Sequence, residues 1–308
     1  MRLALLIAVI AVSIAPARSA APIASAPYQI GYGGLYVVDV RLNGQGPYPF
    51  ILDTGSTTSL IFDSLLEDMT PQLSGAPPQS VIGLADRGLF DAFTLGDIEL
   101  AGLTLEDAEG PILPSWPGPN APRGLLGLNF LNRYILVFDH KTRRIDFYDP
   151  SAPPDPDLYD RWSRVRLDPG NFGDKNTTLV TLRGDLNGVS TRLIFDLGAE
   201  RPIANFAVLE EIIDGAAFSR SRTDRRQYAA VVDIFRSEAR VHAVRFSNFS
   251  VGKTRWSDEI FLITEALIFE ELDVADKPFG LFGASLLRNR NFMIDFPGET
   301  LWIGPVRK

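Results

Sequence analysis

Apolar and polar residues alternate in short runs along most of the chain after residue 28. The stretch 35–40, Leu-Tyr-Val-Val-Asp-Val, is one such run, and a period of two is typical of a half-buried β-strand. Helical periodicity is confined to short pieces near residues 62–69 and 207–213. Asn-Gly pairs at 43–44 and 187–188 lie between apolar runs, as expected of tight hairpins. We therefore expect an all-β protein with a few short helices.

An apolar run followed by Asp-x-Gly occurs in both halves of the chain. The first copy is Asp-Thr-Gly at 53–55, and the second is Asp-Leu-Gly at 196–198. Each copy comes shortly after one of the Asn-Gly pairs, at nearly the same distance. The sequence therefore predicts the same order of strand, hairpin, strand and Asp loop in both halves.

A second repeat is longer and has no gap. Residues 124–139 align with residues 280–295, and both copies begin Gly-x-x-Gly and end in Asp. Asn129 and Ser285 occupy the same place in the two copies, where each could cap a short helix. Asp139 and Asp295 also coincide. Because Asp is common where a strand enters a turn, we interpret these two as structural rather than as a second carboxylate pair.

A proline-rich segment separates the two copies. Four of the twelve residues 149–160 are proline, which is excluded from sheet interiors and stiffens an exposed connector. We therefore expect an N-terminal lobe over residues 28–150, a linker over 151–159 and a related C-terminal β-lobe over 160–308.

The first residues have the composition of an export signal. Met1 and Arg2 precede an apolar run over 3–14, and small residues follow up to Ala21. We expect residues 1–21 to be a cleaved signal peptide, and the mature protein to be periplasmic or secreted without stable membrane insertion. The alternative is an uncleaved membrane anchor, although the run is shorter than the roughly 20 apolar residues of a spanning helix.

Composition narrows the chemistry further. The net charge is −8, which argues against a nucleic-acid partner, since phosphate neutralisation needs clustered Lys and Arg. The chain has no cysteine and two histidines, which excludes a thiol nucleophile, a thiolate metal site and a three-histidine metal site. We expect no metal and no cofactor, so that hydrolytic chemistry would depend on carboxylates.

Two equivalent Asp loops suit one such chemistry. Attack of water on an amide needs a base for the water's proton and an acid for the amide. Two carboxylates a few ångströms apart cannot both ionise, so they share a proton and titrate as a unit. Two lobes related by an approximate two-fold axis would bring Asp53 and Asp196 together in this way.

The chain resembles the retropepsin and pepsin group of aspartic proteases, especially the bacterial retropepsin-like ones. The resemblance rests on Phe-Ile-Leu-Asp-Thr-Gly-Ser at 50–56, Leu-Leu-Gly at 125–127 and Leu-Phe-Gly at 281–283. It implies two tandem acid-protease-like β-barrel lobes, related by a pseudo-two-fold axis, with Asp53 and Asp196 as the catalytic dyad of an endopeptidase. We expect a monomer that acts on a peptide or protein substrate. The residues expected to support the dyad are Thr54, Gly55, Ser56, Leu197, Gly198 and Ala199.

Leu197 departs from the family's pattern, which has Thr or Ser at this place. In the family the two hydroxyls bond across the junction, and Leu197 cannot return the bond that Thr54 can make. The loss of one hydrogen bond costs on the order of 1 kcal/mol, so we expect an active enzyme. One alternative is a catalytically degenerate fold that binds peptides. Another is a dimer that pairs Asp53 of two chains.

A flap hairpin is expected in the first half only. Its residues would include Ile82, Gly83, Leu84 and Gly88, with the glycines at a mobile tip. The second half has no glycine between 215 and 252, and its residues 220–232 are basic and compatible with a helix. The sequence therefore predicts one flap, from the first lobe. The alternative is that the glycines simply bound a hairpin without a gating role.

Overall fold

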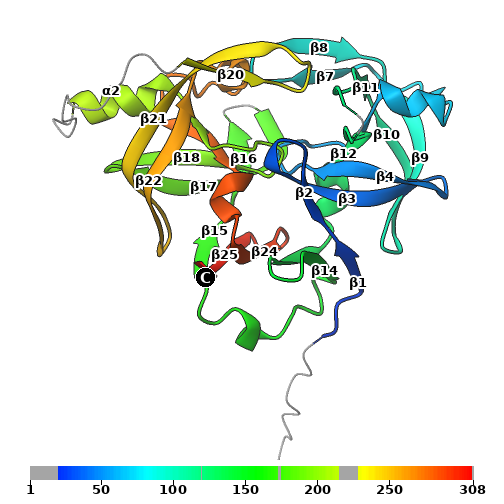
Figure 1. Cartoon of the computed structure of the whole chain (residues 1–308), viewed down its shortest axis with the longest axis horizontal. Coiled ribbons are helices and arrows are strands. Elements are labelled where there is room, and N and C mark those ends of the chain that lie inside the picture. The colour runs from blue at the N-terminus through cyan, green and yellow to red at the C-terminus, as the bar shows by residue number, and fades with distance from the viewer. Residues whose placement is uncertain (1–19, 119, 173–174, 215–227, 307–308) are drawn as a thin grey trace, which may run out of the picture.

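The computed structural model describes residues 20–118, 120–172, 175–214 and 228–306, so the predicted signal peptide lies almost wholly outside the described residues. The fold is mostly β, with curled sheets and a few short helices (Figure 1). The all-β class predicted from the alternating pattern is confirmed. The described strands form three large sheets and one separate two-stranded hairpin.

The first large sheet has nine strands, all from the first half of the chain. They are β2 (Gln29–Gly31), β3 (Leu35–Leu42), β4 (Gln45–Leu52), β5 (Leu60–Phe62), β6 (Gln72–Leu73), β9 (Phe93–Leu100), β10 (Leu103–Gly110), β11 (Ile112–Leu113) and β12 (Gly124–Leu126).

The second large sheet has eight strands, all from the second half. They are β16 (Asp168–Phe172), β17 (Lys175–Leu186), β18 (Val189–Asp196), β19 (Ile203–Ala204), β20 (Tyr228–Val232), β21 (Glu238–Val251), β22 (Thr254–Ile263) and β23 (Phe279–Gly283).

The centres of these two sheets have the same topology. In the first sheet β12 is parallel to β4 and antiparallel to β5, and β11 is parallel to β5. In the second sheet β23 is parallel to β18 and antiparallel to β19, and β22 is parallel to β19. The sequence repeat is therefore a repeat of strand order and strand direction.

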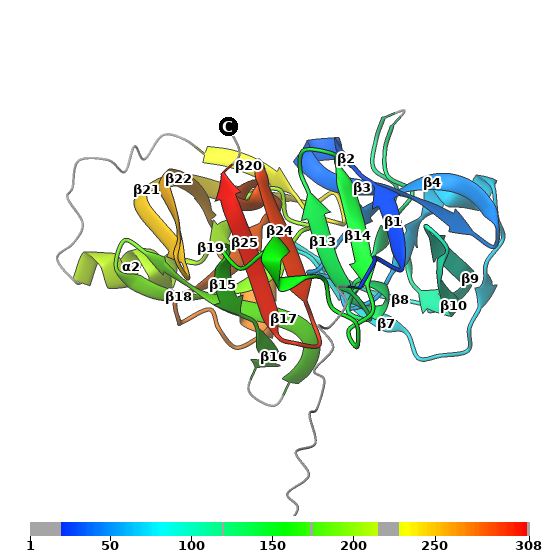
Figure 2. The same ribbon diagram turned by 90° about the horizontal axis from the view of Figure 1, so that it is seen from below.

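The third sheet has six strands and joins the two halves. They are β1 (Ala24–Pro27), β13 (Ile135–Asp139), β14 (Arg144–Tyr148), β15 (Ser163–Arg166), β24 (Arg290–Asp295) and β25 (Thr300–Val306). From one edge the order is β1, β14, β13, and from the other edge it is β15, β25, β24, so corresponding strands meet in the middle (Figure 2). The central pair, β13 and β24, is antiparallel, and the rings of Phe138 and Phe292 stack there with centroids 4.1 Å apart.

The remaining elements are short. The separate hairpin consists of β7 (Gln79–Ile82) and β8 (Arg87–Phe90). The α-helices are α1 (Leu128–Leu131), α2 (Phe206–Asp214) and α3 (Leu267–Glu271). The 3₁₀ turns are η1 (Tyr32–Gly34), η2 (Asp63–Glu67), η3 (Pro156–Leu158) and η4 (Ala284–Leu287). Two of these, η2 and α2, lie where the sequence predicts helical pieces.

Both Asn-Gly pairs form the predicted hairpin turns. Asn43 and Gly44, between β3 and β4, have φ of 51° and 74°. Asn187 and Gly188, between β17 and β18, have φ of 49° and 95°. Positive φ at both central residues is the geometry that favours Asn-Gly in tight hairpins. These turns set the register of the strands that lead to the two Asp loops.

Asp139 and Asp295 do not form a carboxylate pair. Ile135 is the partner of Asp295 across β13 and β24, so Asp139 lies at the opposite end of this antiparallel pair. At about 3.3 Å per residue the two acids are separated by roughly 13 Å. Each also accepts a hydrogen bond from a nearby turn amide, that of Lys141 or Gly298.

Within the described residues, no helix is long and apolar enough to cross a membrane.

The stacked pair at the centre of the shared sheet generates a stability prediction. Phe292 and Phe138 are fully buried, so we expect Phe292→Ala to lower the free energy of unfolding by about 3–5 kcal/mol. Urea unfolding of the purified protein measures the change. The control is Leu89→Ala, which removes a side chain that is 72% exposed and should change the free energy by less than about 0.5 kcal/mol. An equally small loss for Phe292→Ala would contradict a stabilising role for this pair.

Candidate active site

Asp53 stands at the end of β4, where the chain turns away from the sheet. Its backbone amide donates to the carbonyl of Leu126 on β12 (3.0 Å), which fixes the loop to the neighbouring strand. The amide of Gly55 donates to Asp53 Oδ1 (2.8 Å). Ser56 turns its hydroxyl to the carbonyl of Thr58 (2.8 Å) and so rigidifies the rest of the loop.

Asp196 occupies the equivalent place at the end of β18. The amides of Gly198 (2.8 Å) and Ala199 (3.1 Å) donate to Asp196 Oδ1. Each carboxylate is therefore oriented by the backbone of its own loop, as the equivalence of the two Asp-x-Gly sequences predicts.

Thr54 ties the two loops together. Its hydroxyl donates to the carbonyl of Phe195 (2.8 Å) and accepts from the amide of Leu197 (2.9 Å). Both Thr54 and Leu197 are fully buried. Leu197 has no hydroxyl to return these bonds, so it contributes apolar packing instead. The predicted half-lock from Thr54 is present.

The glycines let the loops approach until each carboxylate lies against the opposite loop. A Cβ atom on Gly55 would lie 2.6 Å from the carboxyl carbon of Asp196, and one on Gly198 would lie 2.4 Å from that of Asp53. Real Cβ atoms do not come so close, so only glycine fits at either position. Asp53 and Asp196 therefore each lie against the glycine of the opposite Asp loop.

Burial raises the pKa values of both facing carboxyls. For Asp53 burial is the largest cause, and the negative charge of Asp196 raises the pKa further, against the opposing effect of the Gly55 and Ser56 amides. For Asp196 burial outweighs the amides of Gly198 and Ala199 and raises the pKa to about 6. The pair therefore retains a proton at a pH at which an ordinary Asp is ionised.

Residues of the longer sequence repeat hydrogen-bond to the two Asp loops. The amide of Leu128 donates to the carbonyl of Ser56 (2.9 Å), and that of Ala284 donates to the carbonyl of Ala199 (2.8 Å). These bonds are equivalent under the repeat. They explain why each half of the chain carries its own Gly-x-x-Gly as well as its own Asp loop.

The predicted capping role of Asn129 and Ser285 is wrong. The residues at the N-termini of α1 and η4 are Gly127 and Gly283, and neither element has a side-chain cap. Asn129 Oδ1 instead accepts from the hydroxyl (2.7 Å) and amide (2.9 Å) of Ser59, and the Ser59 hydroxyl accepts from Gly127 N (3.0 Å). Asn129 therefore braces the segment that follows the first Asp loop.

The residues predicted for a flap lie on the β7–β8 hairpin, which we call the flap hairpin. Ile82 ends β7, Gly83 and Leu84 form the tip, and Gly88 lies on β8. The Gly83 amide donates to the carbonyl of Asp86 (2.8 Å) and closes the turn. Gly83 is glycine because of a close approach, since a Cβ atom there would lie 2.6 Å from Asp233 Oδ2.

A second hairpin lies next to the flap hairpin, and the expectation of one working flap from the first half stays a prediction. This second hairpin comes from the second half, where β20 pairs with β21, and its turn meets the tip of the flap hairpin. In Figure 1 the strands β7, β8 and β20 lie along the same edge of the molecule, where hydrogen bonds to Asp233 join the two hairpins. Part of the basic stretch 220–232, residues 220–227, lies outside the described residues. Tyr228–Val232 is strand, not helix.

Sequence reasoning missed the second hairpin because its turn contains no glycine. The residue with positive φ is Arg236 (67°), and the Asp233 carboxylate satisfies the turn's amides. An Asp at the start of a turn is the signal that was available.

One comparison concerns the half of the chain that carries Asp53 and the flap hairpin. Residues 38–130 match the family model of aspartyl proteases. The match begins on β3 and ends in α1, so it includes the first Asp loop and stops well before Asp196. A search of curated proteins finds no match to the chain. The aspartyl protease match therefore covers the Asp53 loop. The internal repeat of the fold relates the Asp196 loop to it.

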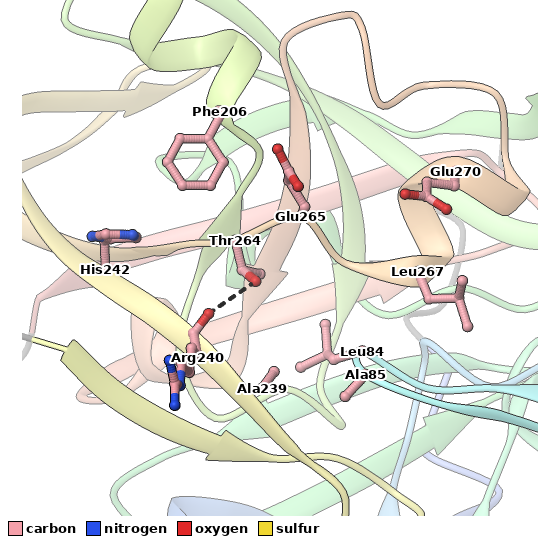
Figure 3. A pocket seen from close by; sticks show the side chains of 10 residues that line it. All are labelled: Leu84, Ala85, Phe206, Ala239, Arg240, His242, Thr264, Glu265, Leu267 and Glu270. Carbon is pink, nitrogen blue, oxygen red and sulfur yellow. Dashed lines mark hydrogen bonds between the residues drawn. The ribbon is translucent and has the colours of Figure 1, made fainter.

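A cavity of about 400 Å³ lies where the flap tip meets the second half. Its walls come from the flap tip, β21, β22, the start of α2 and α3, and it is lined by Leu84, Ala85, Phe206, Ala239, Arg240, His242, Thr264, Glu265, Leu267 and Glu270 (Figure 3). The lining is rich in charged groups and includes no residue of either Asp loop. Across the described residues, no group of three or more His, Cys, Asp or Glu side chains is arranged to hold a metal ion.

The raised pKa of Asp53 predicts a pH-dependent stability change. An Asp whose pKa is raised on folding stabilises the fold below its unfolded pKa, near 3.9, and this contribution is lost as the pH rises through the folded value. Asp53→Asn does not titrate, so we expect its stability relative to wild type to increase between pH 4 and pH 7. Each unit of pKa elevation contributes about 1.4 kcal/mol.

Thermal unfolding at the two pH values measures this difference. Asp139→Asn is the control, because it makes the same change at the end of a strand outside the Asp loops. A stability difference for Asp53→Asn that is the same at both pH values would show that burial and repulsion do not perturb this carboxyl.

Proposed function

We propose that the protein is an aspartic endopeptidase of the retropepsin and pepsin type, in which Asp53 and Asp196 of one chain form the catalytic dyad. The observation that carries the proposal is the facing of two half-buried carboxylates, each held against the glycine of the opposite loop. The match of residues 38–130 to aspartyl proteases supports the same activity.

The chemistry follows from one proton shared by two carboxyls. A water molecule held between them loses a proton to the ionised carboxylate and attacks the carbonyl carbon of the peptide bond. The protonated carboxyl hydrogen-bonds the carbonyl oxygen as negative charge develops there. The carboxyl that took the water's proton then gives it to the amide nitrogen, the C–N bond breaks, and the pair is left with one shared proton as before. Because the two carboxyls are partly shielded from water, these charges interact more strongly than they would in bulk water.

The loops keep this geometry without a symmetric lock. Thr54 makes two buried hydrogen bonds to the second loop, and Leu197 fills the opposite position with apolar packing. The Gly55 and Gly198 amides hold the carboxylates in place from each side. We infer that this is sufficient for activity, so that Leu197 marks a difference between the halves rather than decay.

We also propose that the mature protein acts outside the cytoplasm, after removal of residues 1–21. The charged start, the apolar run and the small residues that follow support this location. N-terminal sequencing of the protein from its own cell envelope or medium would test it, because an intact Met1 would indicate a retained anchor.

Cleavage of a mixed peptide library tests the proposed activity. We expect Asp53→Asn and Asp196→Asn each to lower kcat/KM by at least about 10³-fold, because each removes one member of a unit. A statine-type transition-state mimic should inhibit the wild type, and Asp139→Asn should cleave normally.

Two other outcomes would point to other functions. Activity that survives Asp196→Asn and not Asp53→Asn would indicate a dimer that pairs the first halves of two chains. Absence of cleavage at every pH, in protein shown to be folded, would indicate a peptide-binding module.

The pH profile of kcat/KM is a second test. At low pH both carboxyls are protonated and the base is lost, and at high pH the shared proton is lost and with it the acid. Ordinary carboxyls have pKa values near 4. Since burial raises both pKa values here, we expect a bell-shaped profile in which both apparent pKa values lie above 4. A rate that keeps rising down to pH 3 would contradict the raised values.

A further inference from the structure

An apolar cluster lies beside Asp53, on the side of the flap hairpin. Its buried members come from β3, β4, β5, β11 and β12, and they are Leu35, Ile51, Leu60, Phe62, Leu113 and Leu125. Ile51 lies two residues before Asp53, so the two side chains point to the same side of the extended chain. Leu125 precedes Leu126, whose carbonyl receives the Asp53 amide. We call this group the Asp53-side cluster.

The chain covers this cluster with its own side chains. Val81 and Phe90 of the flap hairpin pack against it, and so do Ile234 and Phe235 from the turn between β20 and β21. The rings of Phe235 and Phe90 stack with centroids 5.7 Å apart and planes 14° apart. Ile234 and Phe235 therefore lie next to the flap side chains on the apolar surface beside Asp53. Neither is fully buried.

The Asp233 carboxylate holds this turn against the flap tip. Oδ2 accepts from the amides of Ala85 (3.1 Å) and Asp86 (3.2 Å) of the flap, and Oδ1 accepts from the amides of Phe235 and Ser237 (2.9 Å each) of its own turn. Asp233 is only 4% exposed. One buried carboxylate thus joins the two hairpins through four backbone N–H groups, and charge-assisted bonds of this kind are among the stronger ones.

The flap tip packs closely against the turn between β20 and β21. At Gly83 a Cβ atom would lie 2.6 Å from Asp233 Oδ2 and 3.1 Å from a ring carbon of Phe235. The Ser237 hydroxyl also donates to Asp86 (3.2 Å). Within the eight-stranded sheet β20 is an edge strand that pairs with β21 alone, so the turn can move with little disruption of the sheet.

We propose that residues 233–237 are a self-occluding latch: Asp233 pins them to the flap tip, and Ile234 and Phe235 occupy the apolar surface beside Asp53 until a substrate displaces them. This inference rests on the proposed function, because it assigns the occupied surface to the substrate. Asp233 is then a positioning residue, which acts on the closed state and not on the reacting atoms.

Hydrogen exchange tests the latch without any substrate. In Asp233→Asn one acceptor oxygen becomes an NH₂ group, so one of the two pairs of amides loses its acceptor. In Gly83→Ala the added methyl group forces the turn off the tip. We expect the exchange of residues 83–88 to be at least tenfold faster in both variants.

Asp185→Asn is the control, because Asp185 accepts from the amide of Gly188 in a hairpin turn elsewhere in the second half. Exchange of residues 83–88 that is unchanged in Asp233→Asn and Gly83→Ala would overturn the latch.

Steady-state kinetics tests the occlusion. If Phe235 competes with substrate, Phe235→Ala should lower KM several-fold for peptides with a large apolar residue at the scissile bond, with kcat nearly unchanged. Gly83→Ala should also lower KM, and it keeps the aromatic ring in the chain. Leu89→Ala, on the same hairpin and exposed, is the control. A raised or unchanged KM for Phe235→Ala would show that Phe235 forms a wall of the substrate site rather than a plug.

The failures of the two proposals can be told apart. If no peptide is cleaved, the proposed function fails, and the exchange of residues 83–88 still decides whether the latch exists. If a statine-type peptide binds to the wild type, faster exchange at residues 233–237 in the complex would support displacement of the turn, and slower exchange there would overturn it.

Discussion

The mutual repulsion of two half-buried carboxylates, one from each copy of the Asp loop, is the constraint on which the rest of the structure depends. Bringing Asp53 and Asp196 together is costly, because each loses water and faces a like charge. The fold offsets this cost with loop amides that orient each carboxylate, and it allows the approach by placing glycine where any side chain would collide. Thr54, buried between the loops, fixes their relative position.

The surrounding sheets make this arrangement rigid on one side and adjustable on the other. On one side, the six-stranded sheet runs continuously through β13 and β24, so its hydrogen bonds join the two halves. On the other side, two hairpins meet tip to tip through Asp233 and an aromatic stack. The hairpins can therefore move without breaking the shared sheet, whereas a separation of the halves would break it.

Local chemistry accounts for what the sequence could predict. Asn-Gly turns, alternating strands and the two Asp-x-Gly loops have signatures within a few residues, and the repeat at 124–139 and 280–295 shows which loops correspond. Long-range contacts account for what it could not. Asn129 bonds to Ser59, seventy residues away, and so does not act as the expected cap. The turn at 233–237 lacks glycine because Asp233 and Arg236 take over its geometry.

Leu197 shows what a duplicated chain permits. An assembly of two identical subunits must place every residue twice, so a substitution that suits one side of a symmetric centre is imposed on the other. Here the Thr54 hydroxyl bonds into the second loop, while the matching position has become part of the hydrophobic interior. A chain that carries both copies can thus change one loop without changing the other, and the two sides of the candidate site are free to differ.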